Sequence, residues 1–511
     1  MENLMKEFRE DIKDFREMTD KFYGKEVSMK EYKGFSGGFG SYAQRGGNVS
    51  MIRFRLPGGR ISKDKLKFLA DTVEKYQINK AHLTTCQAVQ FHNVEGKFVG
   101  DIMEEALDAG IITRGGGGDF PRNVMVSPLS GVEKGEYFDV LPFAQKVSDY
   151  LITQIKAVHM PRKLKVGFSN SPANVTHATF RDLGFVAREN GNFDVYSAGG
   201  LGNNARFGVK VGEDVAPSEL LYYVKAMIET FITYGNYENR GKARTRYMQE
   251  TLGEEGYKEA FQKKLDEVKG KYDLSMTVEE ISHMKEGNGS TVFDSRVIEQ
   301  KQEGLYTVVY HPIGGIIPVD KFGELYGVIR DMEEAELRIA PDETLYIINL
   351  NGEEAKKVLS VTSDGAKTLF ETSVACIGST ICQVGLRDSQ GLLAAIIQEV
   401  DAHNFADGVL PRIHISGCPS SCGTHQIGQL GFRGASKKVD GKMQPAFAFF
   451  VNGYDGQGEE RFGEEWGIMT AEDIPHFFVD LGEEISRQDM TYDEWFEKKP
   501  EDLRKIAEKY L

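Results

Sequence analysis

The sequence has no long apolar segment and no excess of basic residues. No run approaches the roughly 20 apolar residues that a membrane-spanning helix needs. Acidic residues number 77 against 62 Lys and Arg, so the formal net charge is −15, which argues against general binding to nucleic acid. The first residues are charged and lack the apolar core of a secretory signal. We therefore expect a cytoplasmic protein that binds neither membrane nor nucleic acid.

Cysteine is scarce and unevenly distributed. Only five cysteines occur in 511 residues; four lie between Cys376 and Cys422, and Cys86 stands alone. Disulfides are disfavoured in a reducing cytoplasm, and unrelated core cysteines would be scattered along the chain. The clustering therefore favours metal ligation.

Two segments of the chain repeat one another at a nearly constant distance. Residues 55–66 contain Gly-Gly, Ile and Asp-Lys, and residues 311–322 contain the same order 256 positions later. Residues 161–167 and 411–417 share Pro-Arg and a following glycine at a distance of 250 positions. Ordered matches at such a constant distance indicate an internal duplication.

Each half of the duplication predicts a small α/β unit followed by a larger α+β unit. Residues 51–56 and 82–91 are typical of strands, and residues 64–76 place Leu66, Leu69 and Val73 on one helical face. Strands and helices mixed in this way predict an α+β fold. The expected boundaries are an N-terminal helical or extended arm over 1–45, a small unit over 46–115, a larger unit over 116–250, a linker over 251–304, a second small unit over 305–370 and a second larger unit over 371–511.

The clustered cysteines form two pairs with unusual spacing. Five residues separate Cys376 from Cys382, and three separate Cys418 from Cys422 within a Gly-Cys-Pro-Ser-Ser-Cys-Gly segment. A cubane cluster requires four thiolates, one for each iron. Structural zinc usually has two or four residues between paired cysteines and often a histidine, so it fits these spacings poorly. We interpret the four cysteines as ligands of a [4Fe–4S] cluster.

The two cysteine motifs resemble the signature of the siroheme-dependent nitrite and sulfite reductases. The resemblance runs over nearly the whole chain, from residues 42–44 and 53–59 through 119–123 to the cysteines and residues 452–453. That family is also built from two fused, pseudo-symmetric halves. The resemblance implies three domains around a central siroheme and [4Fe–4S] site, in which the small units are ferredoxin-like half-domains and the larger units bind siroheme and cluster.

The resemblance also implies a pocket of basic side chains above the siroheme. Cations in a pocket poor in water would offset the repulsion between an anionic substrate and an electron-rich centre, and could deliver protons. Lys163 and Lys165 alternate along a candidate strand and should point to the same face. By motif, the four basic residues are Arg53, Arg122, Lys163 and Lys165.

The same resemblance assigns residues to the cofactors. Cys422 would be shared between the cluster and the siroheme iron, and the other three clustered cysteines would complete the ligand set. His92 is left out of the catalytic set because a lone histidine is more often structural. The residues expected to contact the macrocycle or its surroundings are Thr84, Gln87, Gln90 and Asn123.

Two positions depart from the family pattern. Cys86 stands where members usually have arginine, and His82 or Arg114 could supply the missing charge. A small buried role for Cys86 is a better expectation than a role as fifth ligand. Ser420 stands where asparagine is common. Both departures leave the substrate preference open.

The Lys-x-Lys pattern at 163–165 resembles a sulfite-type pocket and favours reduction of sulfite to sulfide, with reduction of nitrite to ammonia as the alternative. The Gly-rich segment 199–202 does not complete a GxGxxG fingerprint, so electrons should come from a separate ferredoxin or flavoprotein. Two other classes remain. One is a siroheme-free oxygenase of the cobalamin pathway, disfavoured by the intact cation pocket, and the other is a non-catalytic iron–sulfur electron carrier.

Overall fold

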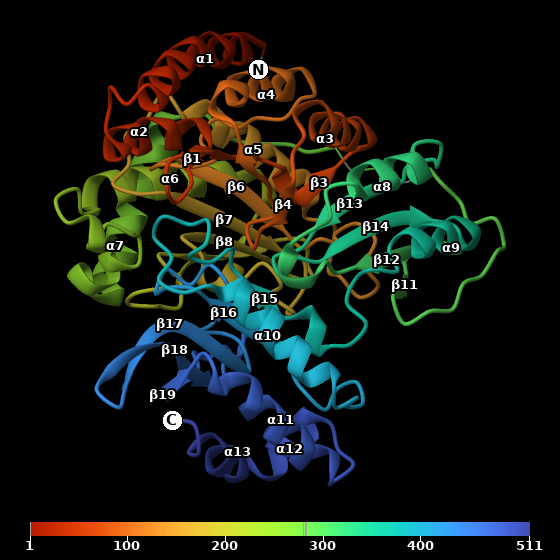
Figure 1. The fold of residues 1–511 in the computed structure, drawn as a ribbon. Helices are drawn as coiled ribbons and strands as arrows, with labels where there is room; N and C mark the ends of the chain where they lie inside the picture. The colour runs from red at the N-terminus through yellow and green to blue at the C-terminus, as the bar shows by residue number, and fades with distance from the viewer. Residues whose placement is uncertain (1, 280, 282–283) are drawn as a thin grey trace. The chain divides into compact units, whose positions relative to one another are not determined.

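The computed structural model describes residues 2–279, 281 and 284–511. Within them the chain packs into two compact units, and both mix helices with strands, so the fold is α+β as predicted (Figure 1). None of the described helices combines the length and the apolar character that crossing a bilayer requires. Unit 1 consists of Met1–Gly200, Asn204–Tyr310 and Ile317–Ser363, and unit 2 of Leu201–Asn203, His311–Ile316 and Asp364–Leu511.

The first half of the chain contributes a small antiparallel sheet to unit 1. Between its strands lies the helix α3 (Lys63–Tyr76), which begins after Ser62, whose hydroxyl accepts from the Lys65 amide. Leu66, Leu69 and Val73 are buried, as the helical period predicted. The sheet order is β1 (Ser41–Ala43), β2 (Ser50–Phe54), β5 (Val89–Val94) and β4 (Lys80–Leu83), and α4 (Gly96–Asp108) follows β5.

The second half repeats this arrangement within unit 1. Its strands have the same order, with the helix α8 (Lys321–Ile329) between β12 and β13 in the chain and α9 (Gly352–Val361) after β14. One further strand is donated by the first half. The order is β11 (Val297–Glu299), β12 (Tyr306–Tyr310), β14 (Leu345–Leu350), β13 (Glu336–Ile339) and the donated β3 (Arg60–Ile61).

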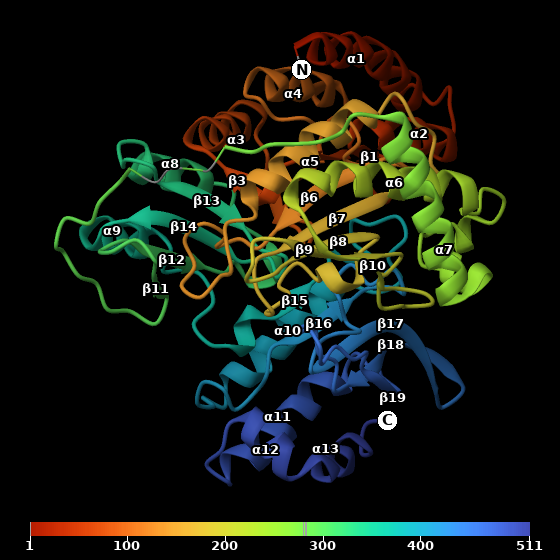
Figure 2. The same ribbon diagram turned by 180° about the vertical axis from the view of Figure 1, so that it is seen from behind.

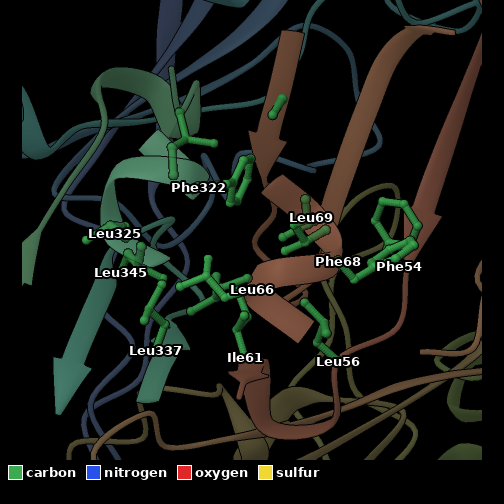
Figure 3. Packing of buried hydrophobic residues seen from close by; sticks show 14 of the residues in the cluster. Phe54, Leu56, Ile61, Leu66, Phe68, Leu69, Phe322, Leu325, Leu337 and Leu345 are labelled. Carbon is green, nitrogen blue, oxygen red and sulfur yellow. The ribbon is translucent and has the colours of Figure 1, made fainter. Parts of the chain in front are cut away.

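One hydrophobic core joins the two small copies. Leu56, Ile61 and Leu66 come from the first copy, and Leu337 and Leu345 from the second, and all belong to a single cluster of buried side chains (Figure 3). Ile61 on β3 lies opposite Leu337 on β13 in the shared sheet. Burying a side chain of this size contributes about 1.5–3 kcal/mol. Either copy alone would expose its apolar face, so the two copies stabilise each other.

Backbone conformation confirms the duplication at single residues. Gly58 and Gly314, separated by 256 positions, have φ values of 63° and 57°. Asn93 and Asn349 are also 256 positions apart and have φ values of 59° and 60°. Left-handed conformations are uncommon outside glycine, so their recurrence at one spacing shows that both copies follow the same path.

Each half also contains a larger mixed sheet with one topology. In both, the first three strands are parallel and the last two are antiparallel to their neighbours. Unit 1 has β6 (Pro121–Val126), β7 (Leu164–Ser169), β8 (Leu183–Ala187), β9 (Phe193–Ser197) and β10 (Val209–Val215); unit 2 has β15 (Val374–Ala375), β16 (Ile413–Ser416), β17 (Leu430–Val439), β18 (Lys442–Val451) and β19 (Glu464–Thr470).

The remaining helices accompany these sheets. Figure 2 shows α6 beside α7, and α7 also contacts β10. In unit 1 they are α1 (Glu2–Tyr23), α2 (Met29–Ser36), α5 (Leu141–Gln154), α6 (Leu220–Tyr234) and α7 (Tyr247–Lys271); in unit 2 they are α10 (Ser389–Asp401), α11 (Asp473–Ser486), α12 (Tyr492–Lys498) and α13 (Pro500–Ala507).

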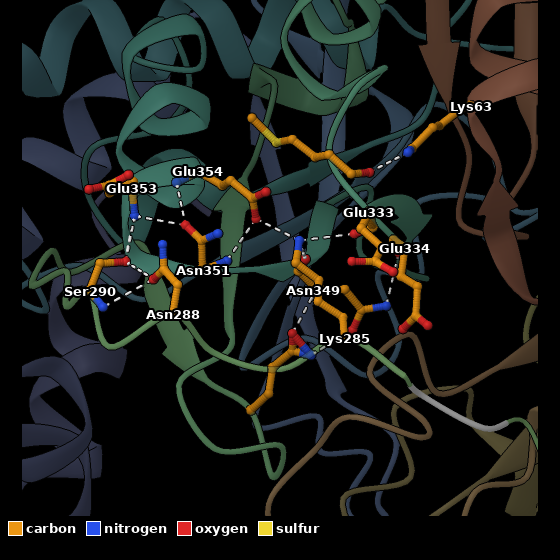
Figure 4. A network of polar contacts seen from close by, with 12 residues as sticks. Lys63, Lys285, Asn288, Ser290, Glu333, Glu334, Asn349, Asn351, Glu353 and Glu354 are labelled. Carbon is orange, nitrogen blue, oxygen red and sulfur yellow. Dashed lines mark hydrogen bonds and ion pairs between the residues drawn. The ribbon is translucent and has the colours of Figure 1, made fainter.

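The connection between the halves begins as the helix α7 and then becomes extended. One buried lysine anchors the extended part to the second small sheet. The ammonium group of Lys285 donates to the carbonyl oxygens of Asn349 at 2.6 Å and Glu333 at 2.9 Å, and to the Glu354 carboxylate at 2.6 Å (Figure 4). A buried charge needs such partners, so Lys285 fixes the path of the connection.

A buried ion-pair cluster ties β3 to β13. Arg60 donates to the carboxylate of Glu336 at 2.8 Å, and Arg338 donates to it at 2.7 Å. Burial alone raises the pKa of Glu336, but the guanidinium groups of Arg338 and Arg60 outweigh burial and hold it at about 2. The carboxylate therefore stays ionised between two cations at the seam of the two copies.

We predict that Glu336→Gln destabilises unit 1 by about 3 kcal/mol, because the buried Arg338 and the half-buried Arg60 would lose their shared carboxylate. The folded pKa lies below the ordinary value of 4.5. The stabilisation is therefore complete above about pH 4.5 and is lost as the pH falls toward about 2. Thermal unfolding followed by circular dichroism should show the wild type approaching the variant in acid. Glu299→Gln, at an exposed partner of Lys134, should leave Tm unchanged; equal losses in both variants would contradict this prediction.

Candidate functional site

Basic side chains from several strands of unit 1 converge on a glycine-rich loop. Arg53 on β2 and Arg122 on β6 both donate to the carbonyl oxygen of Gly116, at 2.6 and 2.9 Å. Arg122 donates a second hydrogen bond to the carbonyl of Gly118 at 2.8 Å. The shared acceptor holds two like-charged guanidinium groups side by side.

The charge of these groups is not balanced by carboxylates. Burial, together with the charge of the neighbouring Arg53, lowers the pKa of Arg122 to about 10, and burial is the larger cause. In the described part of the chain, no carboxylate lies within ion-pair distance of Arg53, Arg122 or Lys165. Half-buried cations without counter-charges favour an anion as ligand.

Gln90 positions Arg53. It lies opposite Arg53 in the β2–β5 pair, and its amide oxygen, when turned toward Arg53, accepts from the guanidinium Nε at 2.8 Å. The amide nitrogen then donates to His92 Nε2 at 3.3 Å. His92 is buried, and burial is the first cause that holds its pKa well below the ordinary value, so it accepts this bond as a neutral ring.

Lys163 and Lys165 flank the buried Leu164 at the start of β7, and both lysines are half-buried. Because successive residues of an extended chain point to opposite faces, the two lysines share one face. The main-chain amide of Lys165 donates to the Asp182 carboxylate at 2.8 Å, and Arg244 donates to the same carboxylate at 3.0 Å. Asp182 thus fixes the start of β7.

Cys86 lies among these cations and is half-buried, in the turn between β4 and β5. Burial raises the pKa of Cys86, but the charges of Lys165, Arg181 and Lys163 outweigh burial and lower the pKa to about 6. The expectation of a small buried role for Cys86 stays a prediction, and the charges around the half-buried thiol add to it a cationic environment.

His82 and Arg114 are the residues expected to supply the charge that arginine would provide at position 86. His82 faces Glu343 at 3.4 Å, and Arg114 lies over the Phe39 ring at 4.2 Å from its centroid. The guanidinium group that acts on Cys86 belongs to Arg181, which donates to the Thr176 carbonyl at 2.7 Å. No motif in the sequence pointed to Arg181, because it is 95 residues from Cys86 in the chain.

The turn that carries Cys86 is built by residues expected to contact the cofactor. Thr84 accepts from the Ala88 amide at 3.2 Å, and Asn123 donates to the carbonyl of Cys86 at 3.1 Å. Gln87 is fully buried; its amide donates to Val126 at 2.7 Å and accepts from the same residue at 2.8 Å. The Gln87 amide therefore joins the turn to β6, and its contact with the cofactor stays a prediction.

Strand topology brings the two cysteine motifs of unit 2 together. Cys376 follows β15 directly, and Cys418 follows β16 by two residues. The two strands are parallel neighbours, with Ala375 opposite Ile415, so their carboxyl ends meet at one edge of the sheet. The Gly417 amide donates to the Cys376 sulfur at 3.1 Å. The motifs lie side by side although about 40 residues separate them in the chain.

Two glycines permit this close approach. A Cβ on Gly423 would lie 2.0 Å from the carbonyl oxygen of Ile415, and one on Gly417 would lie 2.5 Å from that of Arg387. No side chain tolerates such distances. The loops carrying the two cysteine pairs can pack together only because these positions are glycine.

The thiols differ in burial and surroundings. Cys418 is buried, Cys422 is exposed, and the other two are intermediate. Burial, followed by the charge of Cys422, raises the pKa of Cys376 to about 12. Among the described residues, no three Cys, His, Asp or Glu side chains converge on a single ion site. A [4Fe–4S] cluster binds each thiolate at a different iron. Its four ligands therefore lie around the cluster and do not converge on one ion.

A group of four cysteines in unit 2 and a cationic pocket in unit 1 are typical of a redox protein that acts on an anion. Comparison with known proteins identifies the family. Residues 117–269 match the model of the nitrite and sulphite reductase 4Fe-4S domain. Residues 42–109 and 298–361 match the model of the nitrite/sulfite reductase ferredoxin-like half domain. The chain belongs to the nitrite and sulfite reductase family and is an oxidoreductase.

Individual relatives are distant. The chloroplastic ferredoxin–nitrite reductase of Zea mays is 27% identical over 421 residues, covering 79% of this chain and 73% of that protein. The sulfite reductase [NADPH] hemoprotein beta-component of Bacillus pumilus is 26% identical, covering 76% and 74%. The NirA protein structure of Mycobacterium tuberculosis has the same fold, with a TM-score of 0.75, 22% identity and coverage of 93% and 92%.

The cofactors of this family are siroheme and a [4Fe–4S] cluster. The residues present fit both groups. Four cysteines supply the donor set for the cluster, and cations without carboxylate partners suit a macrocycle that carries carboxylates. The matched 4Fe-4S domain model, residues 117–269, contains Arg122, Lys163 and Lys165 but neither Arg53 nor any of the clustered cysteines.

We predict that Gly423→Ala prevents cluster assembly, because a methyl group would displace the Ile415 carbonyl and separate the two cysteine loops. Iron and acid-labile sulfide, measured after anaerobic purification, should fall to a small fraction of the wild-type content. Gly327→Ala in α8, where a Cβ would meet nothing within 4 Å, is the matched control and should retain the full content. A fully loaded Gly423→Ala variant would contradict the proposed packing.

Proposed function

We propose that this chain catalyses the six-electron reduction of a small oxyanion, with sulfite to sulfide favoured over nitrite to ammonia. The observation that carries the proposal is that Arg53 and Arg122 share the Gly116 carbonyl, that Lys165 lies on the strand next to that of Arg122, and that none of the three has a carboxylate partner in the described chain. When bound, siroheme and the cluster supply the electron transfer and the site of reduction. The protein binds and orients the anion and holds the protons that oxygen removal consumes.

The substrate preference follows from charge. Each cation near the anion contributes more to binding a dianion than a monoanion, because the Coulomb energy scales with the product of charges. Lys163 and Lys165 on one face, together with Arg53 and Arg122, therefore suit sulfite better than nitrite. Nitrite is the second candidate, because several relatives, including that of Zea mays, are named nitrite reductases.

The proposed ligand set of the cluster is Cys376, Cys382, Cys418 and Cys422. Cys422 is the proposed thiolate shared with the siroheme iron, and its exposure distinguishes it from the buried Cys418. The electron donor is proposed to be a separate protein, either a ferredoxin, which the name of the Zea mays relative contains, or a flavoprotein.

We predict that Lys165→Asn lowers kcat/KM for sulfite about tenfold more than for nitrite, because a dianion loses more than a monoanion when one cation is removed. Steady-state assays with reduced viologen and each anion would measure the ratio. Lys97→Asn, at a lysine whose side chain is 65% exposed, should change neither value. An unchanged ratio in Lys165→Asn would remove the basis for preferring sulfite.

We also predict that Cys422→Ser removes the spectral signature of coupled siroheme and cluster, because serine is a poor ligand for both irons. Visible absorption and electron paramagnetic resonance of the purified variant would report it. Ser420→Ala changes an exposed residue of the same loop and should keep the wild-type spectrum. A Cys422→Ser variant with full siroheme absorption and turnover would show that the ligand assignment is wrong.

A further inference from the structure

A row of polar side chains crosses the first small sheet and ends at Arg53 in the cationic pocket. His82 on β4 lies opposite Gln90 on β5, and Gln90 lies opposite Arg53 on β2. Residues paired in this way project from the same face of a sheet. His82 and Gln90 are buried. Buried polar groups are costly unless they form hydrogen bonds, so the row needs partners along its whole length.

The end of the row away from Arg53 faces a carboxylate from the second small copy. Glu343 lies in the turn between β13 and β14, and its Oε1 atom is 3.4 Å from His82 Nε2, within ion-pair distance. Only 5% of the His82 side chain and 1% of the Glu343 side chain are exposed.

The duplication shows that this turn does not require a carboxylate. Gln87 occupies the same place in the first copy, 256 positions before Glu343. Both residues have a positive φ, 56° for Gln87 and 71° for Glu343, so the two turns follow the same path. One turn carries an uncharged amide and the other an acid. The reason for the acid therefore lies in what it faces, which is His82.

A second histidine lies beside the row. His92 is two residues from Gln90 on β5 and so shares its face. The ring centroids of His82 and His92 are 6.3 Å apart, whereas directly bonded imidazoles have centroids about 5 Å apart. In the described chain, both nitrogens of His82 and Nδ1 of His92 are buried without a hydrogen-bond partner. Buried polar atoms rarely stay unpaired, and one water between the rings would satisfy an atom on each.

The charges at the two ends fix the direction of every hydrogen bond in between. A guanidinium group only donates, so Gln90 presents its oxygen to Arg53, and its amide nitrogen then donates to His92 Nε2 at 3.3 Å. His92 is a neutral ring, so Nδ1 carries its proton and would donate to the water. The water would donate onward to His82, whose other nitrogen faces the Glu343 carboxylate, which only accepts.

We propose that His82 and Glu343 are positioning residues of the anion pocket. Together with one water bound between the rings of His82 and His92, they fix the orientation of the Gln90 amide, and Gln90 in turn holds the Arg53 guanidinium. The inference rests on the proposed function in one respect, which is that Arg53 contacts the anion. No covalent bond changes in this role.

A crystal structure of the holoprotein tests the water without any assumption about the substrate. We expect one ordered water at about 3 Å from a ring nitrogen of His82 and from one of His92. Direct contact between the two rings would overturn the inference. The absence of a water between them, at a resolution that shows other buried waters, would overturn it as well.

Anion binding tests the positioning role. Nitrite is titrated into the oxidised holoprotein, and the visible spectrum of the siroheme gives the dissociation constant. His82→Leu removes both ring nitrogens, so the dissociation constant should rise about fivefold, the effect of one neutral hydrogen bond. His82→Gln can accept from the water and donate to Glu343, so it should restore most of the affinity. His403→Leu changes an exposed histidine of unit 2 and should leave the affinity unchanged.

A double-variant cycle separates positioning from a general loss of structure. Gln90→Leu removes the link between His92 and Arg53, so adding His82→Leu to it should raise the dissociation constant no further. An equal effect of His82→Leu in the presence and absence of Gln90 would overturn the inference. If His82→Leu does not fold, Glu343→Gln takes its place in the same cycle, because it removes the charge and keeps the size, and the same outcomes decide.

The outcomes separate this inference from the proposed function. If the wild-type holoprotein binds nitrite and His82→Leu binds it equally well, the positioning role is wrong and the anion pocket remains. If the wild-type holoprotein binds neither nitrite nor sulfite, the proposed function is wrong, and the positioning role fails with it.

Discussion

Parallel pairing of neighbouring strands is the constraint on which both candidate sites depend. In unit 1, β6 pairs with β7, with Pro121 opposite Leu164, so Arg122 and the Lys163–Lys165 segment come together at the start of the strands. In unit 2, β15 pairs with β16 in the corresponding place, and the cysteine loops leave the strands at their ends. One duplicated topology thus supplies cations at the amino ends of one pair and thiols at the carboxyl ends of the other.

The cationic pocket is electrostatically costly, and the chain offsets the cost with main-chain dipoles. Arg53 and Arg122 share the Gly116 carbonyl, and Arg181 uses that of Thr176. Carbonyl oxygens reduce the repulsion without neutralising it, whereas carboxylates would have cancelled the attraction for an anion. Glu336 shows the contrast: where the chain needs stability, at the seam of the two small copies, a carboxylate sits between two guanidinium groups.

Much of the candidate site could be predicted from short-range patterns. The helical period placed Leu66, Leu69 and Val73 in the core, and strand alternation placed Lys163 and Lys165 on one face. The close approach of Gly417 and Gly423 to neighbouring main-chain carbonyls could be seen only in the structure, because Ile415 and Arg387 come next to them through the fold. The roles of Gln87 and Arg181 could not be predicted, because their partners are distant in the chain and hydrogen bonding leaves no periodic pattern.

The sequence by itself determined the α+β class, the duplication and the set of residues able to bind iron and an anion, because each depends on local period, residue type or repeat spacing. Only the tertiary structure decided the surroundings of Cys86. The residues next to Cys86 in the sequence do not indicate the pKa of its thiol. That pKa is lowered by Lys165, 79 positions later, and Arg181, 95 positions later, which strand pairing and loop packing bring to the turn. Charge interactions depend on distances in space, so they can be identified only from the tertiary structure.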